Sequence, residues 1–172
     1  MKMFKNIALL ACFVGLVSLG AFAGTSGTLD VSASVTTTCN VQTGAATLAF
    51  GVYDPVVANA STGLDLSGSG TFTLQCTNGE QPYITLDDGQ TAGATDSTRA
   101  MSQGTGGTKT PMSYNVYSDS SHSTLWPSTG GYQYPSQMNG TAQTVTVYGL
   151  VPKGQNLAGG SYTDMIAINV IL

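Results

Sequence analysis

Charged side chains are scarce in this sequence of 172 residues, which has 5 Lys and Arg, 9 Asp and Glu and 1 His. After position 5, the Lys, Arg and Glu residues are only Glu80, Arg99, Lys109 and Lys153. Helix surfaces normally use these residues heavily, so a helical protein is not expected. Without a cluster of Lys and Arg, we expect neither a nucleic-acid partner nor a polybasic membrane-binding patch. Low charge also gives little protection against association, which suits a protein that assembles.

Residues that carry catalysis or bind metals are also few. A Ser-His-Asp triad would have to use His122, which lies in the polar segment 120–124, and the sequence has no Gly-x-Ser-x-Gly elbow. The segment Asp87-Asp88-Gly89 is typical of a hairpin turn rather than of a carboxylate pair. We therefore expect no catalytic residues, no metal site, no cofactor and no small-molecule substrate, although a hydrolase that uses His122 remains an alternative.

The apolar run that stands out lies at the N-terminus. Lys2 and Lys5 precede an apolar segment from Ile7 to Leu19, and Ala21-Phe22-Ala23 matches a small-x-small cleavage rule. The sequence therefore predicts a secretory signal peptide over 1–23 and an exported protein. A transmembrane anchor is the alternative, but the apolar segment is short for one.

Cysteines are also few after this signal, where only Cys39 and Cys76 remain. An even pair in an exported protein predicts a disulfide. A metal site is the competing interpretation, but it is disfavoured by the single His and by the absence of a Cys-x-x-Cys pair.

Alternating apolar and polar residues recur along the rest of the chain, with turn residues between them. They predict an all-β, antiparallel sandwich and no helix of normal length. The expected strands cover 46–53, 70–76, 81–86, 112–118, 142–150 and 160–172, with a shorter candidate at 99–101.

The segment 27–36 alternates cleanly, with Leu29, Val31, Ala33 and Val35 on one face and polar residues on the other. It begins close to the expected mature N-terminus. Such an arm can pair within its own domain or with another protein.

The last expected strand, 160–172, is apolar on both faces. A strand of this kind is normally paired on both sides, but no later segment supplies a neighbour. The expected edge residues are Met165, Ile166, Ile168, Val170 and Leu172.

Trp126, Tyr132 and Tyr134 form an aromatic cluster together with two prolines. If exposed, they could bind sugars or an abiotic surface. The simpler interpretation is that they cap the sandwich or pack between subunits.

Several of these segments together are similar to the spore coat protein U domain family, which includes subunits of archaic chaperone–usher pili. The resemblance is carried by the N-terminal alternating strand, Thr38-Cys39-Asn40-Val41, the segments 48–53 and 70–76, Tyr114-Asn115-Val116-Tyr117, and the ending Gly160-Ser161-Tyr162-Thr163-Asp164.

The resemblance implies an incomplete immunoglobulin-like sandwich that lacks its last strand and is completed by donor-strand complementation. It implies a donor arm at 24–37, a domain at 38–172, and insertion of Leu29, Val31, Ala33 and Val35 into a neighbour. Its implied partners are a periplasmic chaperone, an outer-membrane usher and neighbouring pilus subunits. The expected function is that of a cell-surface pilus subunit that supports adhesion and biofilm formation. The alternative is a secreted coat or matrix protein, or a carbohydrate-binding module that acts as a monomer.

Overall fold

The computed structural model describes residues 24–42, 46–103 and 110–172, and the expected signal peptide lies outside these ranges. The chain divides into two units, Met1–Ser34 and Val35–Leu172. Among the described residues of the first unit, 24–34, there is no helix or strand. No helix in the described part of the chain is long and apolar enough to cross a membrane.

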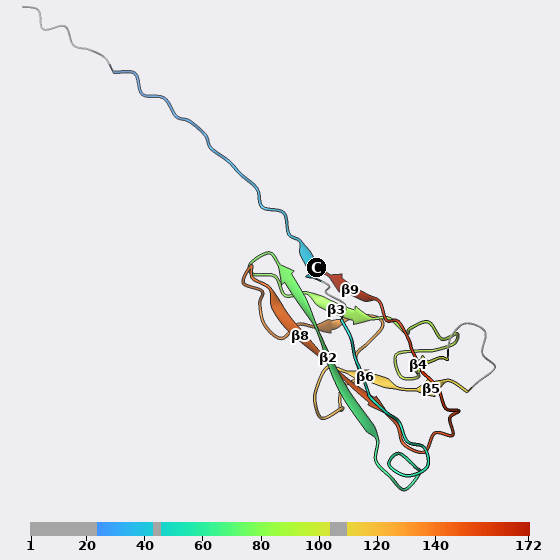
Figure 1. Cartoon of the computed structure of the whole chain (residues 1–172). Helices are drawn as coiled ribbons and strands as arrows, with labels where there is room; N and C mark the ends of the chain where they lie inside the picture. The colour runs from blue at the N-terminus through green and yellow to red at the C-terminus, as the bar shows by residue number, and fades with distance from the viewer. Residues whose placement is uncertain (1–23, 43–45, 104–109) are drawn as a thin grey trace, which may run out of the picture. The chain divides into compact units, whose positions relative to one another are not determined.

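The second unit is built from antiparallel strands, which confirms the predicted all-β class (Figure 1). A four-stranded sheet has the order β1-β2-β8-β6, and a three-stranded sheet has the order β7-β3-β9. Strands β4 and β5 form a separate pair. The strands are β1 (Cys39–Gln42), β2 (Leu66–Cys76), β3 (Tyr83–Leu86), β4 (Ala100–Met101), β5 (Met112–Ser113), β6 (Asn115–Tyr117), β7 (Tyr132–Gln133), β8 (Gln143–Val151) and β9 (Ile168–Ile171).

The longest pairing joins β2 and β8, with Phe72 opposite Val145 and Gly68 opposite Gly149. Because strand side chains alternate between faces, Phe72, Leu74 and Val145 all enter the core. The strands predicted at 70–76, 81–86 and 142–150 correspond to β2, β3 and β8, whose ends differ from the predicted ones by up to four residues.

Four strand predictions need correction, and in two of them no strand forms. Residues 27–36 form no strand, and Leu29 is 88% exposed. Residues 46–53 form no strand either, although Leu48 and Phe50 pack against the core as their alternation predicted. Alternation reports which face is apolar, but a strand also needs a backbone partner, and these segments have no ladder.

The predicted final strand is also shorter than expected, since only Ile168–Ile171 forms β9. Just before it, the Asp87 carboxylate accepts a hydrogen bond from the Ala167 amide at 2.9 Å. A side chain thus takes the place of a backbone partner, and the regular ladder ends there.

The predicted strand at 112–118 is divided at Tyr114. Met112 and Ser113 pair with β4, whereas Asn115–Tyr117 pair with β8. The amide of Tyr114 donates to the carbonyl of Arg99 at 2.9 Å. The chain changes sheets at this residue, while Met112, Tyr114 and Val116 all remain buried.

Candidate functional site

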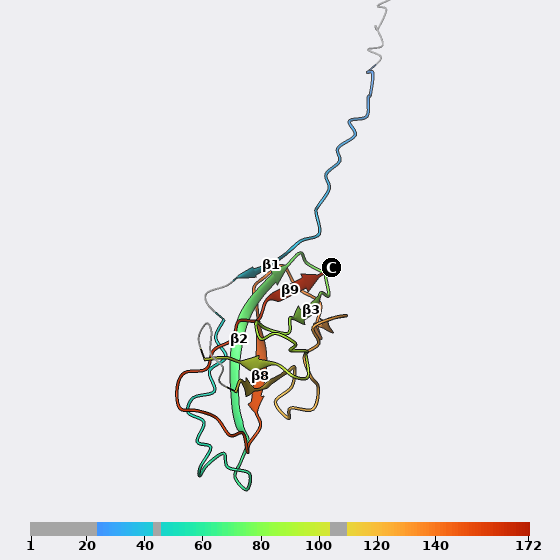
Figure 2. The same ribbon diagram turned by 90° about the vertical axis from the view of Figure 1, so that its right-hand side faces the viewer.

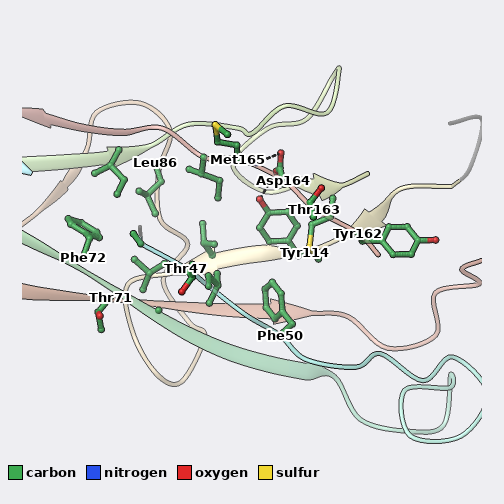
Figure 3. A pocket seen from close by; sticks show the side chains of 18 residues that line it. Thr47, Phe50, Thr71, Phe72, Leu86, Tyr114, Tyr162, Thr163, Asp164 and Met165 are labelled. Carbon is green, nitrogen blue, oxygen red and sulfur yellow. Dashed lines mark hydrogen bonds between the residues drawn. The ribbon is translucent and has the colours of Figure 1, made fainter. Parts of the chain in front are cut away.

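The second unit contains an open groove of about 440 Å³. One rim is the segment Ala46–Phe50, and the other is the segment from Tyr162 to Ile168. Core side chains form its floor: Phe72, Leu86, Tyr114, Val116 and Val147. Figure 3 shows Phe72 and Leu86 at one end of the groove and Tyr162 at the other.

The rim Ala46–Phe50 lies directly on glycines of the central sheet. A Cβ atom on Gly70 would collide with the carbonyl oxygen of Thr47, and one on Gly149 would lie 2.6 Å from Cζ of Phe50. Neither glycine has a positive φ, so close approach of the neighbouring chain, rather than turn geometry, requires them here. The glycines let this rim lie against the sheet without being a strand of it.

Two aromatic rings approach each other inside the groove. The centroids of Phe50 and Tyr114 are 5.9 Å apart, and the ring planes meet at 64° (Figure 3). This edge-to-face arrangement is a favourable one for aromatic pairs. Phe50 belongs to the first rim, so the pair fixes that rim against the buried Tyr114.

The second rim is fixed by Asp164. Its carboxylate accepts hydrogen bonds from the hydroxyl of Tyr114 at 2.6 Å, the amide of Gln90 at 2.8 Å and the amide of Met165 at 2.9 Å. Burial and the hydrogen bond to Asp164 raise the pKa of Tyr114 well above its ordinary value. Tyr114 therefore stays protonated and acts as the donor to this carboxylate.

One edge of β9 continues the second rim. Strand β9 pairs with β3 along one side, and no described strand pairs with its other side. Of the residues predicted for this edge, Met165, Ile166 and Ile168 line the groove. Val170 is half-buried, whereas Met165 is 72% and Leu172 is 56% exposed.

A second pocket of about 600 Å³ continues the groove past Tyr162. It shares Leu48, Phe50 and Tyr162 with the first pocket, and it reaches Pro55 on one side and Leu157 on the other. The two pockets form one extended depression, and the chain runs in opposite directions along its two rims.

The expected donor residues are exposed to solvent, whereas the side chains of the groove floor are buried. Leu29, Val31 and Val35 are between 85% and 88% exposed, and Ala33 is exposed as well. An extended segment with one apolar face and no ladder is a surface that another strand edge could bury.

Arg99 is a structural residue whose role the sequence did not indicate. It is fully buried, and its guanidinium donates to four carbonyl oxygens, those of Leu86, Asp87, Asp96 and Trp126, at 2.6 to 3.2 Å. Burial lowers its pKa from the ordinary value, while nearby carboxylates oppose this shift. Arg99 therefore joins the end of β3, which supports the groove floor, to two loops.

Cys39 and Cys76 form a disulfide that links paired positions of β1 and β2, as the sequence predicts. The bond joins the first strand of the second unit to the long strand β2.

The aromatic cluster is not a surface cluster. Trp126 is fully buried, and its indole N–H donates to the carbonyl of Ile84 at 3.1 Å. Tyr132 and Tyr134 are half-buried and pack against the core. The surface-binding alternative is wrong for Trp126, because its ring lies between Phe72 and Tyr132 in the core.

His122 lies in a tight loop organised by Asp119. The Asp119 carboxylate accepts hydrogen bonds from Ser121, Ser123 and Thr124, and these bonds hold its pKa well below the ordinary value. The His122 ring packs edge-on against Tyr117. In the part of the chain that the structure describes, no three His, Cys, Asp or Glu side chains are grouped to hold a metal ion.

The fold and the groove place this protein among all-β domains with open antiparallel sheets, and solved structures contain such a domain. A chain from the chaperone–tip adhesion subunit pre-assembly complex CsuC–CsuE, from archaic chaperone–usher Csu pili of Acinetobacter baumannii, superimposes with a TM-score of 0.51. The identity is 17%, and the match covers 81% of this chain and 40% of that one. The chain thus spans less than half of that protein, and the likeness concerns the fold.

The sequence itself matches the family model of the Spore Coat Protein U domain over residues 25–169. It is also 35% identical over 170 residues to "Protein U" of Myxococcus xanthus, covering 94% of this chain and 95% of that protein. The chain belongs to the Spore Coat Protein U domain family, as the resemblance in its segments predicted.

Proposed function

We propose that this chain is a structural, non-catalytic subunit of a pilus assembled by the chaperone–usher pathway. In this proposal, the N-terminal arm of one copy enters the groove of the next copy and completes its sandwich. The observation that carries it is the open, mostly apolar groove between Ala46–Phe50 and Tyr162–Ile168, which continues along an edge of β9 that no described strand pairs with. The fold likeness to a chain of a pilus subunit complex supports it.

The arm has the chemistry that such a groove would take. Its apolar face carries Leu29, Val31, Ala33 and Val35, and the groove walls are mostly apolar. Burial of the three larger side chains, with a smaller part from Ala33, would contribute on the order of 5–10 kcal/mol. Backbone pairing with the free edge of β9 would add about 1 kcal/mol per hydrogen bond.

The proposal has consequences for partners and location. In this proposal a periplasmic chaperone covers the open groove before assembly, and an outer-membrane usher is the site of the exchange step. The expected signal peptide would direct the chain into this route. The assembled fibre would lie at the cell surface, where it would support adhesion and biofilm formation.

A second function remains in competition. It is a secreted coat or matrix protein, or a carbohydrate-binding module, that acts as a monomer. The family description, Spore Coat Protein U domain, supports the coat protein. In that case the arm would fold back into its own groove. The two functions differ in whether the arm and the groove that it fills belong to one copy or to two.

Cysteine cross-linking between full-length chains distinguishes the pilus subunit from the monomer. One copy carries Val31→Cys and the other carries Ile166→Cys, and the mixture is oxidised. The matched control replaces Val31→Cys by Ser32→Cys, because position 32 lies on the opposite face of an extended arm. We expect linked pairs of chains from position 31 and few from position 32.

The outcomes are read on non-reducing gels. When both substitutions are placed in one chain, a product that stays monomeric and internally linked supports the fold-back alternative. Equal cross-linking from positions 31 and 32 contradicts both, because the arm then does not enter the groove in a defined register.

A further inference from the structure

An exposed apolar loop lies next to the open end of the groove. Val52 is 86%, Val56 80%, Val57 73% and Leu64 77% exposed. These four residues are called the apolar loop below. Val52 and the neighbouring Pro55 line the second pocket, so the loop borders the extended depression directly. Large apolar side chains grouped on a surface are a mark of an interaction site.

Hydrogen bonds hold this loop in one conformation. The Asp54 carboxylate accepts from the amides of Val56 and Val57 at 2.9 and 3.0 Å. The side chain of Asn59, which is buried, accepts from the Asp54 amide at 2.9 Å and donates to the Leu64 carbonyl at 2.7 Å. The apolar side chains are thus presented by an ordered scaffold.

A second apolar surface lies at the other end of the domain. Tyr83 is 40%, Ile171 49% and Leu172 56% exposed, and Tyr83 is paired with Ile171 between β3 and β9. These three residues are called the apolar end. Figures 1 and 2 show the C-terminus and β1 at one end of the domain and the loop between 54 and 64 at the opposite end.

The free edge of β9 indicates the direction of a strand in the groove. Regular strand geometry exists on the β9 side, whereas the opposite rim, Ala46–Phe50, forms no strand. Antiparallel pairing is slightly more stable per residue than parallel pairing. An arm antiparallel to β9 would leave the groove at the Tyr162 end, beside the apolar loop.

The chain that supplies the arm continues from Val35 to Cys39 in β1, at the end of its domain that carries the apolar end. The domain of the copy that supplies the arm would therefore lie next to the apolar loop of the copy that receives it. Contacts of this head-to-tail kind are not self-complementary, and they generate open filaments.

We propose that the apolar loop of one copy packs against the apolar end of the copy whose arm fills its groove. The inference rests on the proposed function and adds to it a second contact at each joint. This contact restricts bending between neighbouring subunits, and its occupant is a second copy of this chain.

The test uses fibres assembled from the full-length chain in its native host. The loop variant is Val56→Asp with Val57→Asp, and the variant of the opposite surface is Tyr83→Asp, which lies on β3 and lines neither pocket. The matched control, Ser120→Asp with Thr129→Asp, adds the same charge at exposed positions that line neither pocket. We expect fibres from both surface variants with a shorter persistence length and a lower dissociation temperature, and unchanged control fibres.

Fibres of the loop variant with the stiffness and dissociation temperature of the wild type overturn this inference, as does equal softening of the control. Loss of fibres together with loss of the complex with the chaperone would assign the loop to that partner and also overturns it. Failure of the proposed function is a separate result, because there the wild-type chains themselves give no cross-link between arm and groove.

Discussion

Tyr114 and Asp164 are 50 positions apart in the chain, and their side chains meet in a hydrogen bond of 2.6 Å at the rim of the groove. They come from the two segments that are most characteristic of the family resemblance, Tyr114-Asn115-Val116-Tyr117 and Gly160-Ser161-Tyr162-Thr163-Asp164. The bond holds a stretch of rim that has little ladder of its own. In this chain the two segments therefore fix the edge of the groove.

Tyr114→Phe removes this hydrogen bond and keeps the ring that packs on Phe50. Because the acceptor is a carboxylate, we expect the free energy of unfolding to fall by about 1.5–3 kcal/mol. Chemical denaturation measures it. Tyr148→Phe is the control, since the Tyr148 hydroxyl has no partner among the described residues, and an equal loss in the control would contradict the assignment.

The raised pKa of Tyr114 predicts a pH dependence in the alkaline range. The unfolded chain releases this proton near pH 10, a value typical of tyrosine, whereas the folded chain retains it. Above about pH 10 the unfolded state binds fewer protons than the folded state, so the free energy of unfolding falls as pH rises. We expect a steeper fall in the wild type than in Tyr114→Phe when denaturation is measured across this range; parallel curves would refute the prediction.

Arg99→Met keeps most of the side-chain volume but removes every donor to the four carbonyls that Arg99 contacts. Unsatisfied buried acceptors are costly, and we expect a loss of more than about 3 kcal/mol in the free energy of unfolding. Arg99→Lys, which retains a charge and three donors, should lose less. Wild-type stability in Arg99→Met would show that the network is not needed.

Gly70→Ala tests the close contact between the central sheet and the first rim. The new Cβ would collide with the Thr47 carbonyl, so the rim must move, and we expect a loss of about 1–3 kcal/mol. Hydrogen exchange should show faster exchange at the amides of residues 47–50. Gly159→Ala is the control, because no heavy atom lies within 4 Å of its Cβ position. Unaltered exchange in Gly70→Ala would argue against a packed rim.

The disulfide closes a separation of 37 residues. Replacement of both cysteines, Cys39→Ser with Cys76→Ser, should lower the free energy of unfolding by about 4 kcal/mol. Thermal unfolding of the wild type with and without reductant provides a second measurement. If neither change shifts the transition, the bridge does not constrain the unfolded chain.

Much of the fold could be predicted from local pattern. Strands β2 and β8 follow from alternating residues, because more buried and less buried positions alternate along each strand. The groove rims could not be predicted in the same way, since Ala46–Phe50 and residues 162–167 alternate but lack a continuous backbone ladder. The role of Arg99 cannot be predicted from the sequence, because a single Arg between Thr98 and Ala100 carries no periodic signal.

The all-β class, the family, the disulfide pair and the apolar face of 27–36 can be predicted without a structure, because each depends on residue identity and local spacing. Tertiary structure decided that Leu48 and Phe50 lie on a glycine-lined part of the sheet, that Trp126 is buried, and that one side of β9 has no strand partner among the described residues. These features depend on which backbone groups and side chains meet across distant segments. Pairing of that kind is set by the packing of the whole domain and not by any one stretch of it.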